Sequence, residues 1–369
     1  MMTNLCCVIP NLKAGGMERV MAALINNFAK RENVTVHLVL YGIRKEHYYA
    51  IDPKIVTHTP HFEFNNTQRT LSTIRTMRWL RKEIRIISPT TILSFGEYWN
   101  NLVLLSLTGL NFPVFVSDRS QPDKNLGIIH NFLRKHLYKK TKGIICQTEQ
   151  AKAITLKRYA YKNVITIGNP IREINEENIA KENYIVSIGR MIHTKHFDRL
   201  ITLFFNIKTP SWKLIIIGGD SNKQNIFDAL KKQIKRLNME ENVILEGYQK
   251  NIETYLLKSK IFAFMSSSEG FPNVIGEALS AGLPVIAYDC TAGPRDMIES
   301  DKNGFLIPLF DEALFREKLE YLITNEEERE KMGRYAKQSI ATFEPEHICE
   351  KYYRFITTGN ADVPSAHTT

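Results

Sequence analysis

The chain has 369 residues, a hydrophobic fraction of 43% and a formal net charge of +10 at pH 7. This length favours two domains, and the composition is that of a globular protein rather than a disordered or fibrous one. The absence of any run of 18 apolar residues argues against a membrane-spanning helix, and the first ten residues are expected to form a buried strand rather than a signal peptide.

Strands and helices alternate along the whole sequence. In the first half we predict strands 5–10, 34–41, 91–95, 114–117, 143–147 and 164–167, and helices 17–30, 68–87, 100–107 and 128–139. After Asn169-Pro170 and a polar hinge, 172–183, we predict strands 184–188, 212–217, 243–246, 260–265 and 285–288, and helices 197–207, 226–237, 252–258, 312–322, 326–342 and 345–357. Such alternation is typical of parallel, doubly wound sheets, so we expect an α/β protein with two domains, 1–170 and 171–345, facing a ligand cleft. A helix, 346–358, and a disordered polar tail, 359–369, complete the predicted organisation.

The most informative segment is SSSEGFPNVIGEALSAGLP, 266–284. It carries Glu269 and Glu277 eight positions apart, in a loop and helix that follow a predicted strand. Pro272 suits the first position of that helix, which should end before Gly282. A strand, a polar loop and a helix N-terminus make an anion-binding corner, and two carboxylates there suit a ligand with hydroxyls and phosphate. The alternative is an N-terminal Glu favoured by the helix dipole beside an ordinary surface Glu.

The segment SIGRMIHTK, 187–195, follows the first strand of the second half. Arg190 and Lys195 at a strand end would clamp a diphosphate and stabilise a departing phosphate, although two solvated cations are an equally good interpretation. Tyr248 follows another strand and would lie beside a nucleotide base, or pack on the surface. His193 and His196 have no third ligand nearby, and the sequence contains no Asp-x-Asp, so we expect no metal site.

Three places in the first half also follow predicted strands. Gly15 and Gly16 open a helix and allow a ligand to approach the backbone, or simply form a strand-to-helix turn. Asp118 and Arg119 would hold an acceptor or donor hydroxyl, or form a salt bridge with each other. Glu97 and the aromatic residues beside it are further candidates for the cleft wall.

Charge is concentrated in the first half. Residues 1–170 carry 24 Lys and Arg against 10 Asp and Glu, whereas residues 171–369 carry 25 against 29. A basic amphipathic helix can lie on anionic lipid, so we expect this half to contact an anionic membrane or a pyrophosphate lipid; the alternative is a solvated basic helix face. No nucleic-acid motif accompanies the charges, and the five scattered cysteines suit a reducing cytoplasm. The residues expected to contact lipid are Arg69, Arg75, Arg78, Arg81, Lys82, Arg85, Arg134, Lys135, Lys139, Lys140 and Lys142.

These motifs in this order resemble glycosyltransferase family 4, the retaining transferases with two Rossmann-like domains of the GT-B type. The resemblance rests on AGGMER at 14–19, SIGRMIHTK at 187–195, EGFPNVIGE at 269–277 and DCTAGPRDMI at 289–298, and it covers nearly the whole chain. It implies a metal-independent transferase without a cofactor, with Glu269, Arg190 and Lys195 in catalysis and the leaving phosphate helping to deprotonate the acceptor. It also implies a final helix that returns to the first domain. The donor-binding residues that it implies are Gly15, Gly16, Gly189, Arg190, Lys195, Tyr248, Glu269, Gly270, Phe271, Asn273, Val274 and Glu277.

The resemblance further implies a substrate class. We expect a UDP-hexose or UDP-N-acetylhexosamine donor and a lipid-linked or polysaccharide acceptor in the assembly of a bacterial surface glycan. The protein should then be cytoplasmic and peripherally bound to the inner face of the membrane. A GDP-mannose-dependent transferase and a catalytically silent docking subunit are the alternatives. Many family members have a His where this chain has Asp118-Arg119, so only Glu97, Asp118 and Arg119 stand as acceptor-side candidates.

Overall fold

The computed structural model describes residues 2–42, 47–159, 161, 163–175, 179–220 and 224–360. It divides the chain into two compact units, Met1–Pro170 with Pro345–Thr369 (unit 1) and Ile171–Glu344 (unit 2). Part of the predicted hinge, 176–178, and most of the predicted tail, 361–369, lie outside the described residues.

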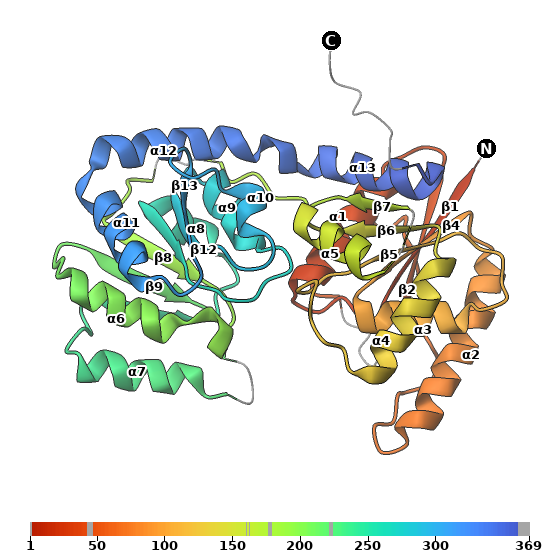
Figure 1. The fold of residues 1–369 in the computed structure, drawn as a ribbon. Helices are drawn as coiled ribbons and strands as arrows, with labels where there is room; N and C mark the ends of the chain where they lie inside the picture. The colour runs from red at the N-terminus through yellow and green to blue at the C-terminus, as the bar shows by residue number, and fades with distance from the viewer. Residues whose placement is uncertain are drawn as a thin grey trace, which may run out of the picture. The chain divides into compact units, whose positions relative to one another are not determined.

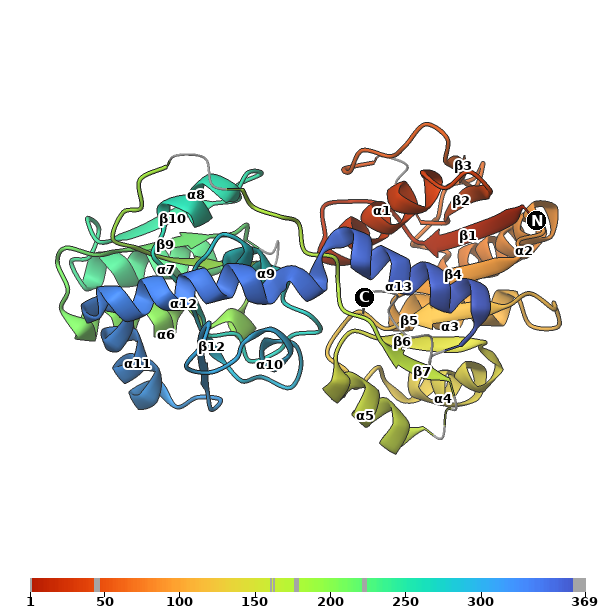
Figure 2. The same cartoon turned by 90° about the horizontal axis from the view of Figure 1, so that it is seen from above.

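Unit 1 is built on a seven-stranded parallel sheet of order β3-β2-β1-β4-β5-β6-β7. Helices α2, α3 and α4 lie side by side on one face of it, while α1 and α13 lie together on the other (Figures 1 and 2). The strands are β1 Thr3–Ile9, β2 Val34–Leu40, β3 Val56–His58, β4 Thr91–Phe95, β5 Val114–Ser117, β6 Gly143–Cys146 and β7 Val164–Thr166. The α-helices are α1 Gly16–Ala29, α2 Arg69–Ile87, α3 Glu97–Ser106, α4 Ile128–Leu137, α5 Glu149–Arg158 and α13 Pro345–Thr358.

Unit 2 has a six-stranded parallel sheet of order β10-β9-β8-β11-β12-β13. The strands are β8 Tyr184–Ile188, β9 Lys213–Ile217, β10 Val243–Gly247, β11 Ile261–Phe264, β12 Val285–Tyr288 and β13 Gly304–Ile307. The α-helices are α6 Phe197–Ile207, α7 Ile226–Arg236, α8 Glu253–Lys258, α9 Asn273–Ser280, α10 Pro294–Met297, α11 Glu312–Thr324 and α12 Glu326–Ser339. Two doubly wound sheets confirm the predicted fold class.

The inner strands are buried from end to end, because helices cover both faces of each sheet. α13 comes last in the chain but packs on the unit 1 sheet, where the ring of Phe355 lies 5.2 Å from that of Phe115. A side chain on Gly143 would collide with Phe355, so a glycine in β6 lets this helix lie close to the sheet.

Several sequence-based predictions about helices need correction. The apolar face predicted for helix 68–87 included Leu71 and Ile74, which are 65% and 41% exposed. The helix instead buries the row Ser72, Thr76, Leu80, Ile84 and Ile87, because two small polar residues continue the four-residue spacing. The helix predicted at 100–107 begins three residues earlier, at Glu97, so the candidates after β4 lie on its first turn. The short elements β3, α5, α10 and β13 were not predicted.

Candidate functional site

An ion pair joins two loops at the carboxyl edge of the unit 2 sheet. Lys195 follows β8 and Glu269 follows β11, and their Nζ and Oε1 atoms are 2.5 Å apart. The side chains are 12% and 14% exposed, so both are largely buried but still accessible to solvent. The Nζ atom also lies 4.7 Å from the centre of the Phe264 ring. Two of the residues predicted to act in catalysis are therefore in direct contact.

Backbone contacts hold the same two loops together. The Ser267 amide donates to the Thr194 carbonyl at 2.9 Å, and the His196 ring nitrogen is 2.8 Å from the Ser267 hydroxyl. Burial lowers the pKa of His196, which favours the neutral ring in this contact. In the loop after β12, burial raises the pKa of the Cys290 thiol to about 12, and the Glu269 carboxylate contributes to the rise. Three neighbouring strands thus deliver their loops to one place.

Glycines allow these loops to approach one another closely. A Cβ on Gly218, after β9, would collide with the Gly189 carbonyl, and one on Gly293 would collide with the Pro272 ring. Gly293 also has φ +103°, a conformation that favours glycine. The DCTAGPRDMI segment, which contains Gly293, therefore positions the loop that precedes α9.

The other predicted donor-binding residues lie at the same edge. Arg190 and Tyr248 are exposed, Gly270 is half-buried, and Tyr248 packs beside Gly219. Pro272 is the residue before the helix rather than its first position, because α9 begins at Asn273. The Asn273 amide donates to the Phe271 carbonyl at 3.0 Å, and the Phe271 side chain is buried against Phe343.

Glu277 lies on α9 with its side chain fully buried. It accepts a hydrogen bond from Arg172 Nε at 3.2 Å, and Arg172 also pairs with Glu253 at the start of α8. A ribose could reach Glu277 only by displacing Arg172 or sharing the carboxylate with it. Sequence reasoning missed Arg172 and Glu253, because neither stands in a motif and 81 positions separate them.

In unit 1, Gly15 and Gly16 form the turn between β1 and α1. Gly15 is extended, and its amide and carbonyl both bond to the Tyr49 hydroxyl, at 3.1 and 2.9 Å. Gly16 is the first helical residue, so backbone amides of the first turn face the carboxyl edge of the sheet.

Asp118 is buried among polar partners. It pairs with Arg134 from α4 and accepts a hydrogen bond from the Tyr138 hydroxyl at 2.6 Å and one from Asn100 at 3.3 Å. The salt bridge considered between Asp118 and Arg119 is therefore wrong, because the carboxylate points to α4 instead. Arg134, which was expected to contact lipid, is 2% exposed and cannot do so in this arrangement.

Arg119 turns toward α13 and the end of β7. It donates to the Tyr352 hydroxyl at 3.1 Å and to Asn169 at 2.7 Å, and its guanidinium lies 4.4 Å from the centre of the Phe95 ring. Its guanidinium thus ties three elements of unit 1 together.

Glu97 is the buried carboxylate of the first α3 turn. It accepts from the Arg119 amide at 3.3 Å and from the Ser120 amide at 3.1 Å, and it also contacts the Ser120 hydroxyl. Burial raises the pKa of Glu97 above its ordinary value, and the Asp118 carboxylate adds to the rise. A carboxylate whose pKa is raised in this way is suited to general-base or general-acid work.

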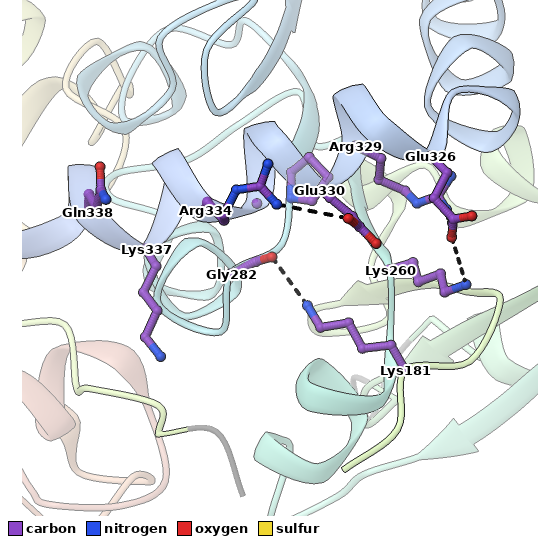
Figure 3. Close-up of a pocket in the computed structure, with 11 residues that line it drawn as sticks. Lys181, Lys260, Gly282, Glu326, Arg329, Glu330, Arg334, Lys337 and Gln338 are labelled. Carbon is purple, nitrogen blue, oxygen red and sulfur yellow. Dashed lines mark hydrogen bonds and ion pairs between the residues drawn. The ribbon is translucent and has the colours of Figure 1, made fainter. Parts of the chain in front are cut away.

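A hollow of about 700 Å³ lies at the opposite, amino edge of the unit 2 sheet, against α12 (Figure 3). Its cations hold the fold together: Lys260 bonds to Asn183 at 2.9 Å, Lys181 to the Gly282 carbonyl at 3.3 Å, and Arg329 to the Leu322 carbonyl at 2.8 Å. The hollow is therefore separate from the Lys195–Glu269 pair.

Two features are absent from the described part of the chain. No three His, Cys, Asp or Glu side chains gather there closely enough to hold a metal ion. None of its helices is both long and apolar enough to cross a bilayer.

Two family models match, one on each unit. The model of Glycosyltransferase Family 4 matches residues 14–173, and that of Glycosyl transferases group 1 matches residues 171–339. The amylovoran biosynthesis glycosyltransferase AmsD of Erwinia amylovora is 27% identical over 92% of this chain and 95% of its own length. A Campylobacter jejuni protein named GalNAc-alpha-(1->4)-GalNAc-alpha-(1->3)-diNAcBac-PP-undecaprenol alpha-1,4-N-acetyl-D-galactosaminyltransferase is 25% identical over 96% of this chain and 98% of its own.

A solved structure supports the fold across both units. A mutant of S. aureus TarM, in complex with fondaparinux, alpha-GlcNAc-glycerol and UDP, aligns with a TM-score of 0.78 over 96% of this chain and 100% of that one, at 16% identity. Two family models in the expected order, full-length relatives named as glycosyltransferases and this GT-B architecture agree with one another. Together these findings identify the chain as a family 4-like glycosyltransferase with the GT-B fold, as its motifs predict.

Proposed function

We propose that this enzyme transfers a hexose or N-acetylhexosamine from a UDP-sugar to a lipid-linked or polysaccharide acceptor, without a metal ion and with retention of the anomeric configuration. The acceptor belongs to a bacterial surface glycan, and transfer takes place at the cytoplasmic face of the membrane. The observation that carries the proposal is the Lys195–Glu269 pair at the carboxyl edge of the unit 2 sheet.

The pair explains how a donor would be held. Lys195 is partly accessible to solvent, and the exposed Arg190 stands in the same loop, so a diphosphate entering from solvent would meet two cations. Glu269, released in part from Lys195 by the incoming phosphate, would accept hydrogen bonds from the sugar hydroxyls. The α9 N-terminus adds a favourable dipole for the anion.

Departure of the nucleoside diphosphate is the step that these residues would assist. Negative charge grows on the leaving phosphate as the glycosidic bond breaks, and Arg190 and Lys195 would stabilise it in a partly desolvated place. The departing phosphate oxygen would accept the proton of the attacking acceptor hydroxyl on the same face of the sugar, which retains the configuration. The cations thereby take the role that a divalent ion plays in other transferases.

Relatives support the finer choices of substrate. A UDP complex of a protein with this fold favours UDP over GDP, and the named undecaprenol-linked acceptor of the C. jejuni relative favours a lipid-linked glycan. The strongly basic unit 1 suits an acceptor that carries a diphosphate.

Donor choice is tested by thermal unfolding with UDP, GDP and ADP, each with and without EDTA. UDP should raise the melting temperature because it binds the native state, and EDTA should leave that shift unchanged. Lys195→Met should abolish the shift, while Arg199→Met, which breaks an exposed ion pair with Glu312 in the same unit, should preserve it. A shift with GDP alone, or one lost in EDTA, would overturn the proposed donor or the metal-free site.

Retention is tested separately on the product. An α-linked product from an α-configured UDP-sugar, assigned by NMR coupling constants at the anomeric carbon, would support it. A β-linked product would contradict it.

A further inference from the structure

The start of α4 exposes three large apolar side chains. Ile128, Ile129 and Phe132 are 91%, 73% and 61% exposed, and we call them the α4 ridge. Gly127 precedes them with φ +84° and has no atoms within 4 Å of a Cβ built there, so the chain faces open space where the helix begins. Ile128 and Ile129 are more exposed than any other large hydrophobic side chain in the described residues, and a patch of this kind marks an interaction surface.

The ridge adjoins the acceptor-side candidates. α4 starts at the carboxyl edge of the unit 1 sheet, after β5, as α3 does after β4. The two helices pack together (Figure 1), and the ring of Tyr98 at the start of α3 meets His130 edge-on at 4.7 Å. Tyr98 is 38% exposed and follows Glu97 in the sequence, so α4 contacts the helical turn that carries this carboxylate.

Positive charge predominates around the ridge. From residue 124 to residue 148 the sequence contains six Lys and Arg residues and no Asp or Glu, and the exposed Asp123 and Glu149 flank this stretch. Arg134 is buried in an ion pair with Asp118, but the other five cations are exposed. Apolar residues within a basic surface match an anionic bilayer, whose phosphates attract Lys while its acyl region accepts Ile and Phe. A second copy of the chain fits less well, because its own basic surface would meet this one. The exposed cations are Lys124, Lys135, Lys139, Lys140 and Lys142.

We propose that the α4 ridge inserts into the interface of an anionic bilayer, and that this insertion brings the Glu97 edge of unit 1 to a lipid-linked acceptor. The inference rests on the proposed function for the identity of the acceptor. The proposed membrane contact is therefore α4 rather than the centre of α2, which the sequence suggests. In α2, Arg81 already donates to the Ser106 and Thr108 carbonyls at 3.0 and 2.7 Å.

The experiment measures co-sedimentation of the full chain with vesicles of phosphatidylglycerol and phosphatidylethanolamine. The variant replaces Ile128, Ile129 and Phe132 by Ser, and should bind at least about tenfold more weakly, because each apolar group lost from the interface lowers membrane affinity. The matched control is Ile86→Ser. Ile86 is 65% exposed like the ridge residues, but it lies at the C-terminal end of α2, at the amino edge of the unit 1 sheet. Control binding should equal that of the unaltered chain.

Charge provides a second arm. Lys135→Glu with Lys139→Glu should weaken binding to these vesicles, and phosphatidylcholine vesicles should bind the unaltered chain poorly. Equal binding of the Ser variant and the unaltered chain would overturn the proposal. So would a dimer in light scattering that the Ser variant dissociates, since the ridge would then be a contact between copies.

The outcome is independent of the donor. UDP should shift the melting temperature of the Ser variant as it shifts that of the unaltered chain. If vesicle binding depends on the ridge but no nucleotide shifts the melting temperature, the membrane proposal is supported and the proposed transferase activity is contradicted. If a nucleotide shifts the melting temperature but vesicle binding does not depend on the ridge, the transferase activity is supported and the membrane proposal is contradicted.

Discussion

The two sheets are wound in the same way, but the ion pairs at their carboxyl edges differ in burial. In unit 2, Lys195 and Glu269 are paired across two loops and remain partly accessible to solvent. In unit 1, Asp118 and Arg134 are paired between a loop and a helix and are almost completely buried. A charged pair that a ligand can reach can exchange partners, whereas a sealed pair can only hold the fold. A pair of opposite charges is thus accessible at one edge and buried within the fold at the other.

Breaking the sealed pair should have the largest effect. Arg134→Met leaves the Asp118 carboxylate buried without its cation, and we expect the free energy of unfolding of unit 1 to fall by about 3–5 kcal/mol. Urea unfolding followed by Tyr and Trp fluorescence measures it. Lys135→Met, one residue along and exposed, should change stability by less than about 0.5 kcal/mol. Equal losses in the two variants would mean that Asp118 and Arg134 do not brace this edge.

Breaking the accessible pair should act on the reaction instead. Glu269→Gln keeps the shape of the side chain but removes its charge, and the transfer rate should fall by about 10²–10³-fold, or about 2.7–4 kcal/mol of transition-state stabilisation. The melting temperature should change little. Glu312→Gln, which removes a carboxylate from an exposed pair in the same unit, is the matched control and should keep full activity. Activity retained in Glu269→Gln would remove Glu269 from catalysis.

A third change separates loop position from charge. An Ala side chain at Gly293 would collide with the Pro272 ring and also strain a φ of +103°, so we expect a loss of about 1–3 kcal/mol and weaker UDP binding. Gly127→Ala imposes a similar φ strain, at +84°, in open space. It should therefore cost less, and nucleotide titration should find its UDP affinity unchanged. If both variants bind UDP normally, the position of the Gly293 loop does not matter for the donor.

The contrast between the edges also explains what the sequence could predict. The positions of Lys195 and Glu269 follow from local patterns, because each residue lies in the loop that follows an apolar strand. Partners distant in the sequence left no such signal: Arg172 meets Glu277 from 105 positions away, and Arg119 meets Tyr352 from 233. Tertiary packing brings those residues together. It also places Arg134, rather than Arg119, beside Asp118.

The smallest expected effect is the pH dependence of stability that the buried Glu97 of unit 1 contributes. The pKa of Glu97 is raised in the folded chain, so between the ordinary Glu value and the raised one the folded state holds more protons than the unfolded state. Stability from this group must therefore decline as pH rises through that interval. Glu97→Gln removes this titration. The melting temperature of the variant, relative to that of the unaltered chain, should therefore rise as pH increases from about 4, near the ordinary Glu pKa, toward neutrality. A constant difference across that range would show that Glu97 titrates normally, and its suitability for acceptor chemistry would then have no support from its pKa.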